Sequence, residues 1–124
     1  MIDEYRRGWA LRYLREAKAE LEAARKIPYM APSLILEAIR KARNAIYYSF
    51  GEPAFIELIV REAAEKMQTI DDPILRFLVS VEESIQQLLQ VEEVDGEKAM
   101  TQADSLVQLA SDIVETLTGE KIRN

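Results

Sequence analysis

The chain of 124 residues contains neither histidine nor cysteine. These two absences exclude an imidazole general base, a thiolate nucleophile and the metal sites that are built from histidine and cysteine. They also leave no indication of a disulfide framework. A glycine-rich phosphate loop and a nucleophile elbow are missing as well. The sequence therefore favours a protein that is not an enzyme over an active enzyme, which stays as the third alternative, and it predicts no cofactor and no metal.

Long hydrophobic runs are absent too. Residues 1–7 are rich in charge and lack the apolar run of a signal peptide, and no stretch approaches the roughly 20 apolar residues that cross a membrane. We therefore expect a soluble cytoplasmic protein without membrane contact. Because 48% of the residues are apolar, a chain of this length can fill one core, so we expect one domain over 1–119 and a short tail over 120–124.

The net charge of −6 is divided unevenly along the chain. Residues 1–50 contain 10 lysines and arginines against 6 acidic residues, whereas residues 51–124 contain 6 against 16. One interpretation is that a basic hairpin packs beside acidic helices, within one molecule or between two copies. The other is that a basic face is reserved for an acidic ligand. The acidic total disfavours general coating of nucleic acid.

Apolar residues recur at helical spacing through nearly the whole chain, and prolines and glycines fall mostly where such segments end. Asp3 is a good N-cap, Gly51 supplies a C-cap and Asp72 stands before Pro73 as a cap does. The pattern predicts an all-α fold of five helices, over 3–26, 32–50, 53–70, 73–91 and 96–118. Connections of about 2 to 6 residues favour antiparallel neighbours, and therefore an up-down bundle with a core of apolar stripes.

The aromatic residues are concentrated in the first half of the chain. If the first hairpin turns near residue 30, Tyr13 lies level with Tyr47, and most of the aromatic rings gather at one end of the bundle. Arg6, Arg7 and Arg12 lie at the same end. The gathered aromatic residues are Tyr5, Trp9, Tyr13, Tyr47, Tyr48, Phe50 and Phe55.

Three interpretations of this aromatic end stay open: a well-packed bundle end, a self-association interface, or a platform on which a nucleotide or single-stranded RNA stacks. An interface would include Tyr5, Trp9, Arg12, Tyr13, Phe50 and Phe55. The alternating topology also brings the turn between the fourth and fifth helices to this end, where its carboxylates would neutralise the arginines. That acidic turn carries Glu92, Glu93, Asp95 and Glu97, which lack the spacing of a calcium loop.

The first two helices resemble a known family. Residues 13–21 (YLREAKAEL) and 35–45 (ILEAIRKARNA) are similar to the opening hairpin of HEPN-type helical bundles and of the related archaeal PaREP1-like proteins. This resemblance covers about the first 50 residues and implies a homodimer. Many HEPN proteins are ribonucleases whose motif is an arginine, a polar residue, three further residues and a histidine. Here Arg43 and Asn44 fit, but Tyr48 replaces the histidine, and its pKa near 10 makes it a poor general acid or base.

Two functions follow as hypotheses. The first is a non-catalytic interaction module, a homodimer or a subunit that binds another protein. The second is a catalytically degenerate, HEPN-like domain that binds a nucleotide or RNA. In that second case the site would be lined by Arg40, Arg43, Asn44, Tyr47 and Tyr48. A structural alternative for the two arginines is a salt bridge across the hairpin, because Arg40 would meet Glu20 and Arg43 would lie near Glu16 or Ala17.

Overall fold

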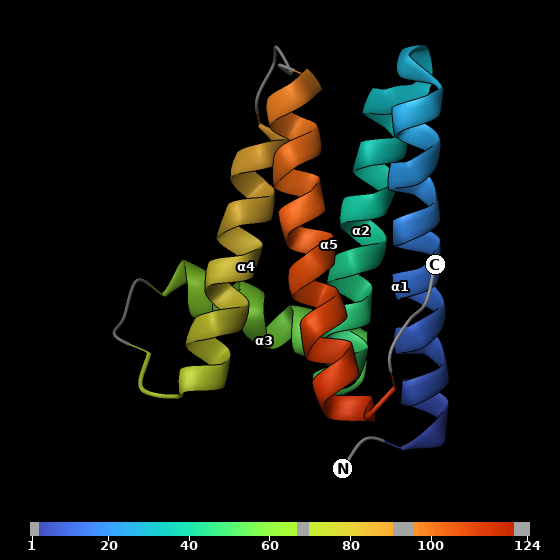
Figure 1. The fold of residues 1–124 in the computed structure, drawn as a ribbon. Coiled ribbons are helices and arrows are strands. Elements are labelled where there is room, and N and C mark those ends of the chain that lie inside the picture. The colour runs from blue at the N-terminus through green and yellow to red at the C-terminus, as the bar shows by residue number, and fades with distance from the viewer. Residues whose placement is uncertain (1–2, 67–69, 91–95, 121–124) are drawn as a thin grey trace.

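A computed structural model describes residues 3–66, 70–90 and 96–120. Its elements are α1 (Glu4–Lys26), the 3-10 turn η1 (Pro28–Met30), α2 (Ala31–Phe50), α3 (Pro53–Glu65), α4 (Pro73–Leu89) and α5 (Gly96–Thr118). Figure 1 shows these helices together. The predicted all-α bundle of five helices is confirmed, and within the ranges just given no helix is both long and apolar enough to cross a membrane.

Helix ends follow local sequence signals. The side chain of Asp3 accepts a hydrogen bond from the Arg6 backbone N–H at 2.8 Å, and Asp72 caps α4 in the same way. At the other end of α5, Gly119 adopts a positive φ of 75° and its N–H donates to the Glu115 carbonyl, as a helix C-cap requires. These caps explain why the sequence locates most helix ends to within a few residues.

The third helix is shorter than predicted. It ends at Glu65 with Lys66 as its cap, whereas the sequence pattern extends it to residue 70. Ile70 is not helical, and Met67, an expected apolar position of this helix, lies outside the described residues. Val60 is the one fully buried residue of α3. So little of α3 is packed that tertiary contacts stabilise this helix only weakly.

The core lies among α1, α2 and α5, and alanine dominates it. Ala10, Ala17 and Ala24 recur every seven residues along α1, and Ala103 and Ala110 do so in α5; all are buried. Small residues at heptad spacing let helix backbones approach closely, while leucines and isoleucines between them fill the remaining space. The result is a tight three-helix unit that gives the rest of the chain a rigid support.

The direction of α5 is fixed by two ion pairs at opposite ends. Arg25, near the end of α1, pairs with Asp104 in the third turn of α5, and Arg7, near the start of α1, pairs with Glu120 just after α5. Helix α5 therefore runs antiparallel to α1. In a bundle that alternates strictly from the first helix to the fifth, these two helices would be parallel, so the order of directions changes along the chain.

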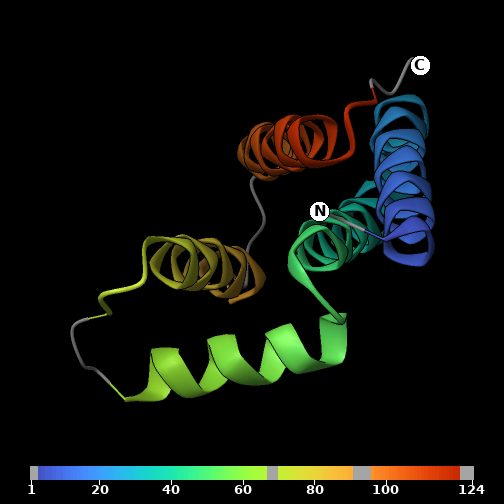
Figure 2. The same cartoon turned by 90° about the horizontal axis from the view of Figure 1, so that it is seen from below.

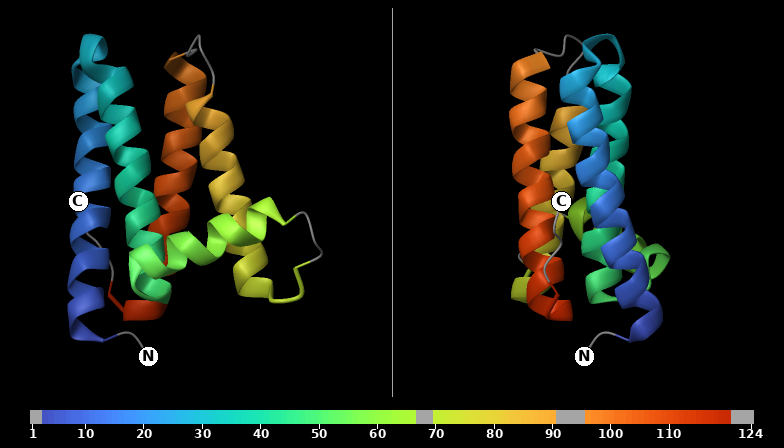
Figure 3. Two further views of the ribbon diagram at one scale, coloured as in Figure 1. Left: turned by 180° about the vertical axis from the view of Figure 1, so that it is seen from behind. Right: turned by 45° about the vertical axis from the view of Figure 1, so that its right-hand side comes forward.

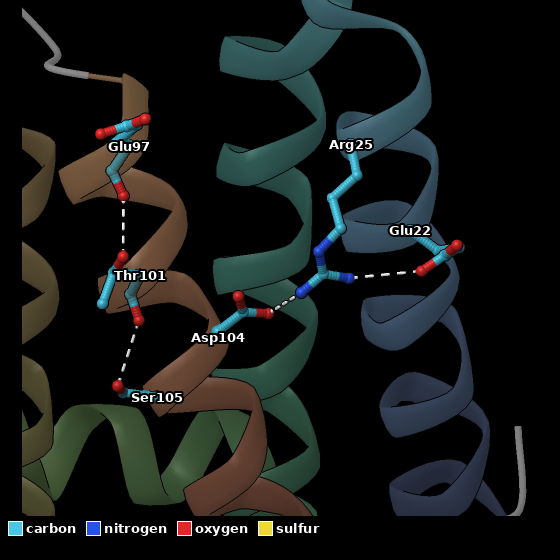
Figure 4. Close-up of polar contacts among 6 residues, drawn as sticks. All are labelled: Glu22, Arg25, Glu97, Thr101, Asp104 and Ser105. Atoms are coloured by element: carbon cyan, nitrogen blue, oxygen red, sulfur yellow. Dashed lines mark hydrogen bonds and ion pairs between the residues drawn. The ribbon is translucent and has the colours of Figure 1, made fainter.

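Helix α3 causes this change because it crosses the bundle instead of running along it (Figures 2 and 3). Consequently α4 runs in the same direction as α1. The end of α4 and the start of α5 therefore lie at the same end of the bundle as the turn between α1 and α2. The prediction that the acidic turn lies at the aromatic end, beside the arginines, is wrong for Glu97. Glu97 belongs to the first turn of α5 at the far end (Figure 4), and Glu92, Glu93 and Asp95 lie outside the described residues.

Candidate interaction surfaces

Four aromatic rings form a continuous cluster on the outer face of the α1–α2 hairpin. Tyr5, Trp9 and Tyr13 follow one another at four-residue spacing on α1, and Tyr48 of α2 lies against them. The rings of Trp9 and Tyr48 have nearly parallel planes, and their centroids are 6.1 Å apart. The centroids of the Tyr13 and Tyr48 rings are 5.8 Å apart. Tyr5 meets Trp9 edge to face at 6.4 Å. Such ring pairs stabilise the hairpin beyond the area that they bury.

Arg12 lies beside these rings. We call this surface the aromatic face and define it as Tyr5, Trp9, Arg12, Tyr13 and Tyr48. The guanidinium carbon of Arg12 lies 5.0 Å from the centroid of the Trp9 ring, within the range of a cation–π contact. Its Nε is 3.8 Å from a Glu16 carboxylate oxygen. Burial, and the nearby Tyr5 and Tyr13 hydroxyls, raise the pKa of Tyr48, so the phenol stays neutral.

On the other side of α2, a polar cluster joins this helix to α4. The Tyr47 hydroxyl donates to Oε2 of Glu82 at 2.9 Å, while Arg43 and Gln86 donate to Oε1 at 3.4 and 3.0 Å. Tyr47 is 1% exposed. Burial, followed by the charge of Glu82, raises the pKa of the phenol. Tyr47 therefore acts as a neutral donor that positions α4.

The five residues predicted to line a nucleotide site make different contacts in the structure. Arg43 and Tyr47 point toward α4, and Tyr48 points into the aromatic face. Arg40 is exposed and pairs with Glu37 of its own helix at 2.8 Å. Asn44 is half-buried, between these directions. The five residues share one side of α2, but contacts within the chain already occupy Arg40, Arg43 and Tyr47.

The expected pairings across the hairpin differ from the observed ones by one residue. Tyr48, and not Tyr47, stacks on Tyr13, and Lys41, and not Arg40, reaches Glu20, at 2.6 Å. Because neighbouring residues on a helix point about 100° apart, a shift of one residue changes which side chains face the partner. The Glu20 carboxylate raises the pKa of Lys41 through this contact.

The other residues of the expected interface are dispersed. Phe50 is half-buried and packs against the core, whereas Phe55 is 64% exposed on α3. Arg6 pairs with Asp3 at 3.1 Å and Arg7 with Glu120, so both arginines find partners near the chain ends. Of the residues predicted for this interface, those in the aromatic face are the ones that the fold assembles.

A second surface was not indicated by the sequence. Helices α4 and α5 stand apart and enclose an open groove with a volume of about 810 Å³. Its apolar part comes from both helices, and Lys98 is its one charged residue. It is lined by Phe77, Ser80, Val81, Ser84, Ile85, Gln87, Leu88, Lys98, Ala99, Thr101, Gln102, Ser105, Leu106 and Leu109. In a chain with 31% charged residues, a lining of this kind is unusual for a surface that only meets water.

Three hydroxyl groups of the groove are already hydrogen-bonded to their own helices. Thr101 donates to the Glu97 carbonyl at 2.9 Å and Ser105 to the Thr101 carbonyl at 3.1 Å (Figure 4). Ser84 donates to the Ser80 carbonyl at 3.0 Å. A neighbour that covers these three side chains would leave their donors satisfied. The groove is also lined by Ser80, Gln87, Lys98 and Gln102, which a neighbour must either leave in water or supply with polar partners.

Within the ranges that the structure describes, no group of three or more acidic residues is placed to hold a metal ion. Comparison of the chain with protein-family models, with curated proteins and with solved structures gives no match.

Proposed function

We propose that this chain is a non-catalytic helical interaction module that associates with a second copy of itself. The observation that carries the proposal is the apolar groove between α4 and α5, which none of the described residues covers. Apolar area exposed to water is unfavourable by about 25 cal/mol per Å². Association that covers the groove would recover this free energy, and a contiguous apolar surface of this kind is typical of protein interfaces.

The chemistry of the groove favours a protein over a small molecule. A small-molecule site normally combines an apolar pocket with a few polar groups that converge on the ligand. Here Thr101, Ser105 and Ser84 turn their hydroxyls toward their own backbones, and Lys98 stands alone as a charge. The groove therefore offers shape and apolar area along two helices, which suits the side of another helical pair.

The absence of catalytic side chains is consistent with this role. The sequence has no histidine and no cysteine, and Tyr47, a buried phenol, is kept neutral by its surroundings. The Glu82 carboxylate beside it is occupied by three donors. Groups held in this way act as structural contacts, because a general acid or base must reach a substrate and exchange protons near neutral pH.

Sedimentation equilibrium at several protein concentrations tests the proposal. We expect the apparent mass to rise from the monomer value of 14.2 kDa toward twice that value, because association depends on concentration. A mass that stays at 14.2 kDa up to about 1 mM, the weakest affinity expected of a specific contact, would contradict self-association.

A second candidate function is the binding of a nucleotide or single-stranded RNA on the aromatic face, as the HEPN resemblance implies. It is favoured by Arg12, which lies 5.0 Å from the Trp9 ring in a half-exposed cluster. Rings and arginines together bind bases by stacking and phosphates by charge. Glu16 beside Arg12 weakens this candidate, because its carboxylate repels phosphate.

The fluorescence of Trp9, the single tryptophan, distinguishes this candidate. If the aromatic face binds RNA, titration with short single-stranded RNA at low salt changes the emission saturably, and moderate salt weakens the binding. Arg12→Ala should then reduce the affinity, while Arg76→Ala, which removes an exposed arginine of α4, serves as the matched control. An unchanged emission would remove RNA binding at this face from consideration.

A further inference from the structure

The exposed side of α5 at the groove has a charge pattern that is complementary to itself. Lys98 and Asp112 lie seven residues on either side of Ser105. Seven residues are almost two helical turns, so all three side chains lie on the same side of the helix. When two α5 helices pack antiparallel with Ser105 at the centre, Lys98 of each copy lies opposite Asp112 of the other.

The structure leaves both charges available for such a contact. Lys98 and Asp112 are exposed, and neither has an ion-pair partner in the part of the chain that the structure describes. Asp112 accepts a hydrogen bond from the Gln108 amide at 3.0 Å, which leaves its other oxygen positions open. Ser105 and Leu109 line the groove and also a shallower hollow that continues to Asp112.

Helix α4 contributes small and apolar side chains to the same groove. Ser80, Val81 and Ser84 line it together with Ser105 of α5. A two-fold axis that places α5 against α5 across the groove also places α4 of one copy against α4 of the other.

We propose that two copies dock groove to groove through an antiparallel α5–α5 contact centred on Ser105, with α4 packed on α4. This inference rests on the proposed self-association and names the surface that carries it. The second copy then closes each groove, so that Leu106 and Leu109 are covered together with Phe77 and Val81 in both chains. A two-fold contact of this kind is self-complementary and closed, which limits the assembly to a dimer.

The area of such a contact predicts a moderate affinity. A helix of 17 residues is about 25 Å long, and two helices side by side are about 20 Å wide, so each copy contributes about 500 Å². The total of about 1,000 Å² lies at the low end of specific interfaces, where dissociation constants are often micromolar. The charges then specify the register more than they increase the affinity.

Charge reversal tests this register. Lys98→Asp and Asp112→Lys each replace two attractive contacts of the dimer with two repulsive ones, so we expect the dissociation constant of each variant to rise about tenfold. An equimolar mixture of the two variants restores both attractive contacts between unlike chains, and the double variant restores them between like chains. Both should recover wild-type affinity. Arg15→Asp, an exposed reversal on α1, is the matched control and should leave the affinity unchanged.

The outcomes separate this inference from the proposed function. If all the variants dimerise as the wild type does, self-association stands and the α5 register is wrong. If the single variants weaken but the mixture does not recover, the two residues are not partners across a two-fold axis, and the inference is also overturned. A wild-type chain that remains monomeric overturns the proposed function itself. Circular dichroism of each variant distinguishes lost association from lost folding.

Discussion

The Tyr47 hydroxyl in α2 donates a hydrogen bond to the Glu82 carboxylate in α4 across 2.9 Å, and Tyr47 is almost fully buried. This contact joins α4 to the tight three-helix unit, while the opposite side of α4 lines the open groove. The position of one wall of the groove therefore depends on a polar contact as well as on apolar packing.

Tyr47→Phe should lower the free energy of unfolding by about 1–2 kcal/mol, because it removes one buried hydrogen bond to a charged acceptor. Arg43 and Gln86 remain to satisfy the carboxylate. Urea denaturation followed by circular dichroism measures the change. Tyr29→Phe is the control, since Tyr29 is 86% exposed, and its stability should equal that of the wild type. Equal losses in both variants would contradict the structural role of the Tyr47 hydroxyl.

The raised pKa of Tyr47 predicts a loss of stability in alkali. In the unfolded chain this phenol ionises near its ordinary pKa of 10.0, whereas in the folded chain it stays neutral to higher pH. The contribution of the neutral Tyr47 phenol to the free energy of unfolding is therefore complete below pH 10. Above pH 10 it falls by up to about 1.4 kcal/mol per pH unit. Lys41, whose pKa is also raised, weakens the fold at high pH independently. The difference between wild type and Tyr47→Phe, measured at pH 8 and 11, isolates the tyrosine and should shrink at pH 11.

Gly51→Ala and Gly8→Ala should change stability in opposite directions. A Cβ at residue 51 would lie 3.0 Å from Cδ1 of Ile56, so we expect a loss of about 1 kcal/mol. A Cβ at residue 8, inside α1, meets no atom within 4 Å, and the better helix former should add up to about 1 kcal/mol. Thermal unfolding measures both. Ile56→Val removes Cδ1 and should reduce the cost of Gly51→Ala; the same cost in that background would contradict the proposed clash.

The sequence predicts the parts of this fold that depend on local signals. The Asp3 cap and the Gly51 break give the bounds of the first two helices almost to the residue. The crossing of α3 could not be predicted, because it depends on where one short and weakly buried helix packs and not on its own periodicity. The pairing of Arg43 with Glu82 follows from that crossing and was missed with it.

Of the two candidate surfaces, the sequence predicts the aromatic face approximately and misses the groove. The expected gathering of aromatic residues predicted the partners of Tyr13 and Trp9 only approximately, since a one-residue change of register replaces Tyr47 with Tyr48. The groove was missed because Ser84 and Ser105 resemble ordinary solvent-facing residues of amphipathic helices. Its one signal in the sequence is the scarcity of charge along these faces, in a chain that is otherwise rich in charge.

Disulfide trapping tests the central claim most directly, because the natural chain has no cysteine that would interfere. A single Ser105→Cys variant places two thiols at the two-fold axis, where facing helices bring Cα atoms within the roughly 4.4–6.8 Å that a disulfide needs. Thr116→Cys, an exposed residue near the end of α5, is the control. Under mild oxidation we predict rapid formation of a covalent dimer for Ser105→Cys and little for Thr116→Cys. Equal trapping of both variants, or none at residue 105 at concentrations where the wild type is dimeric, would contradict the α5–α5 contact.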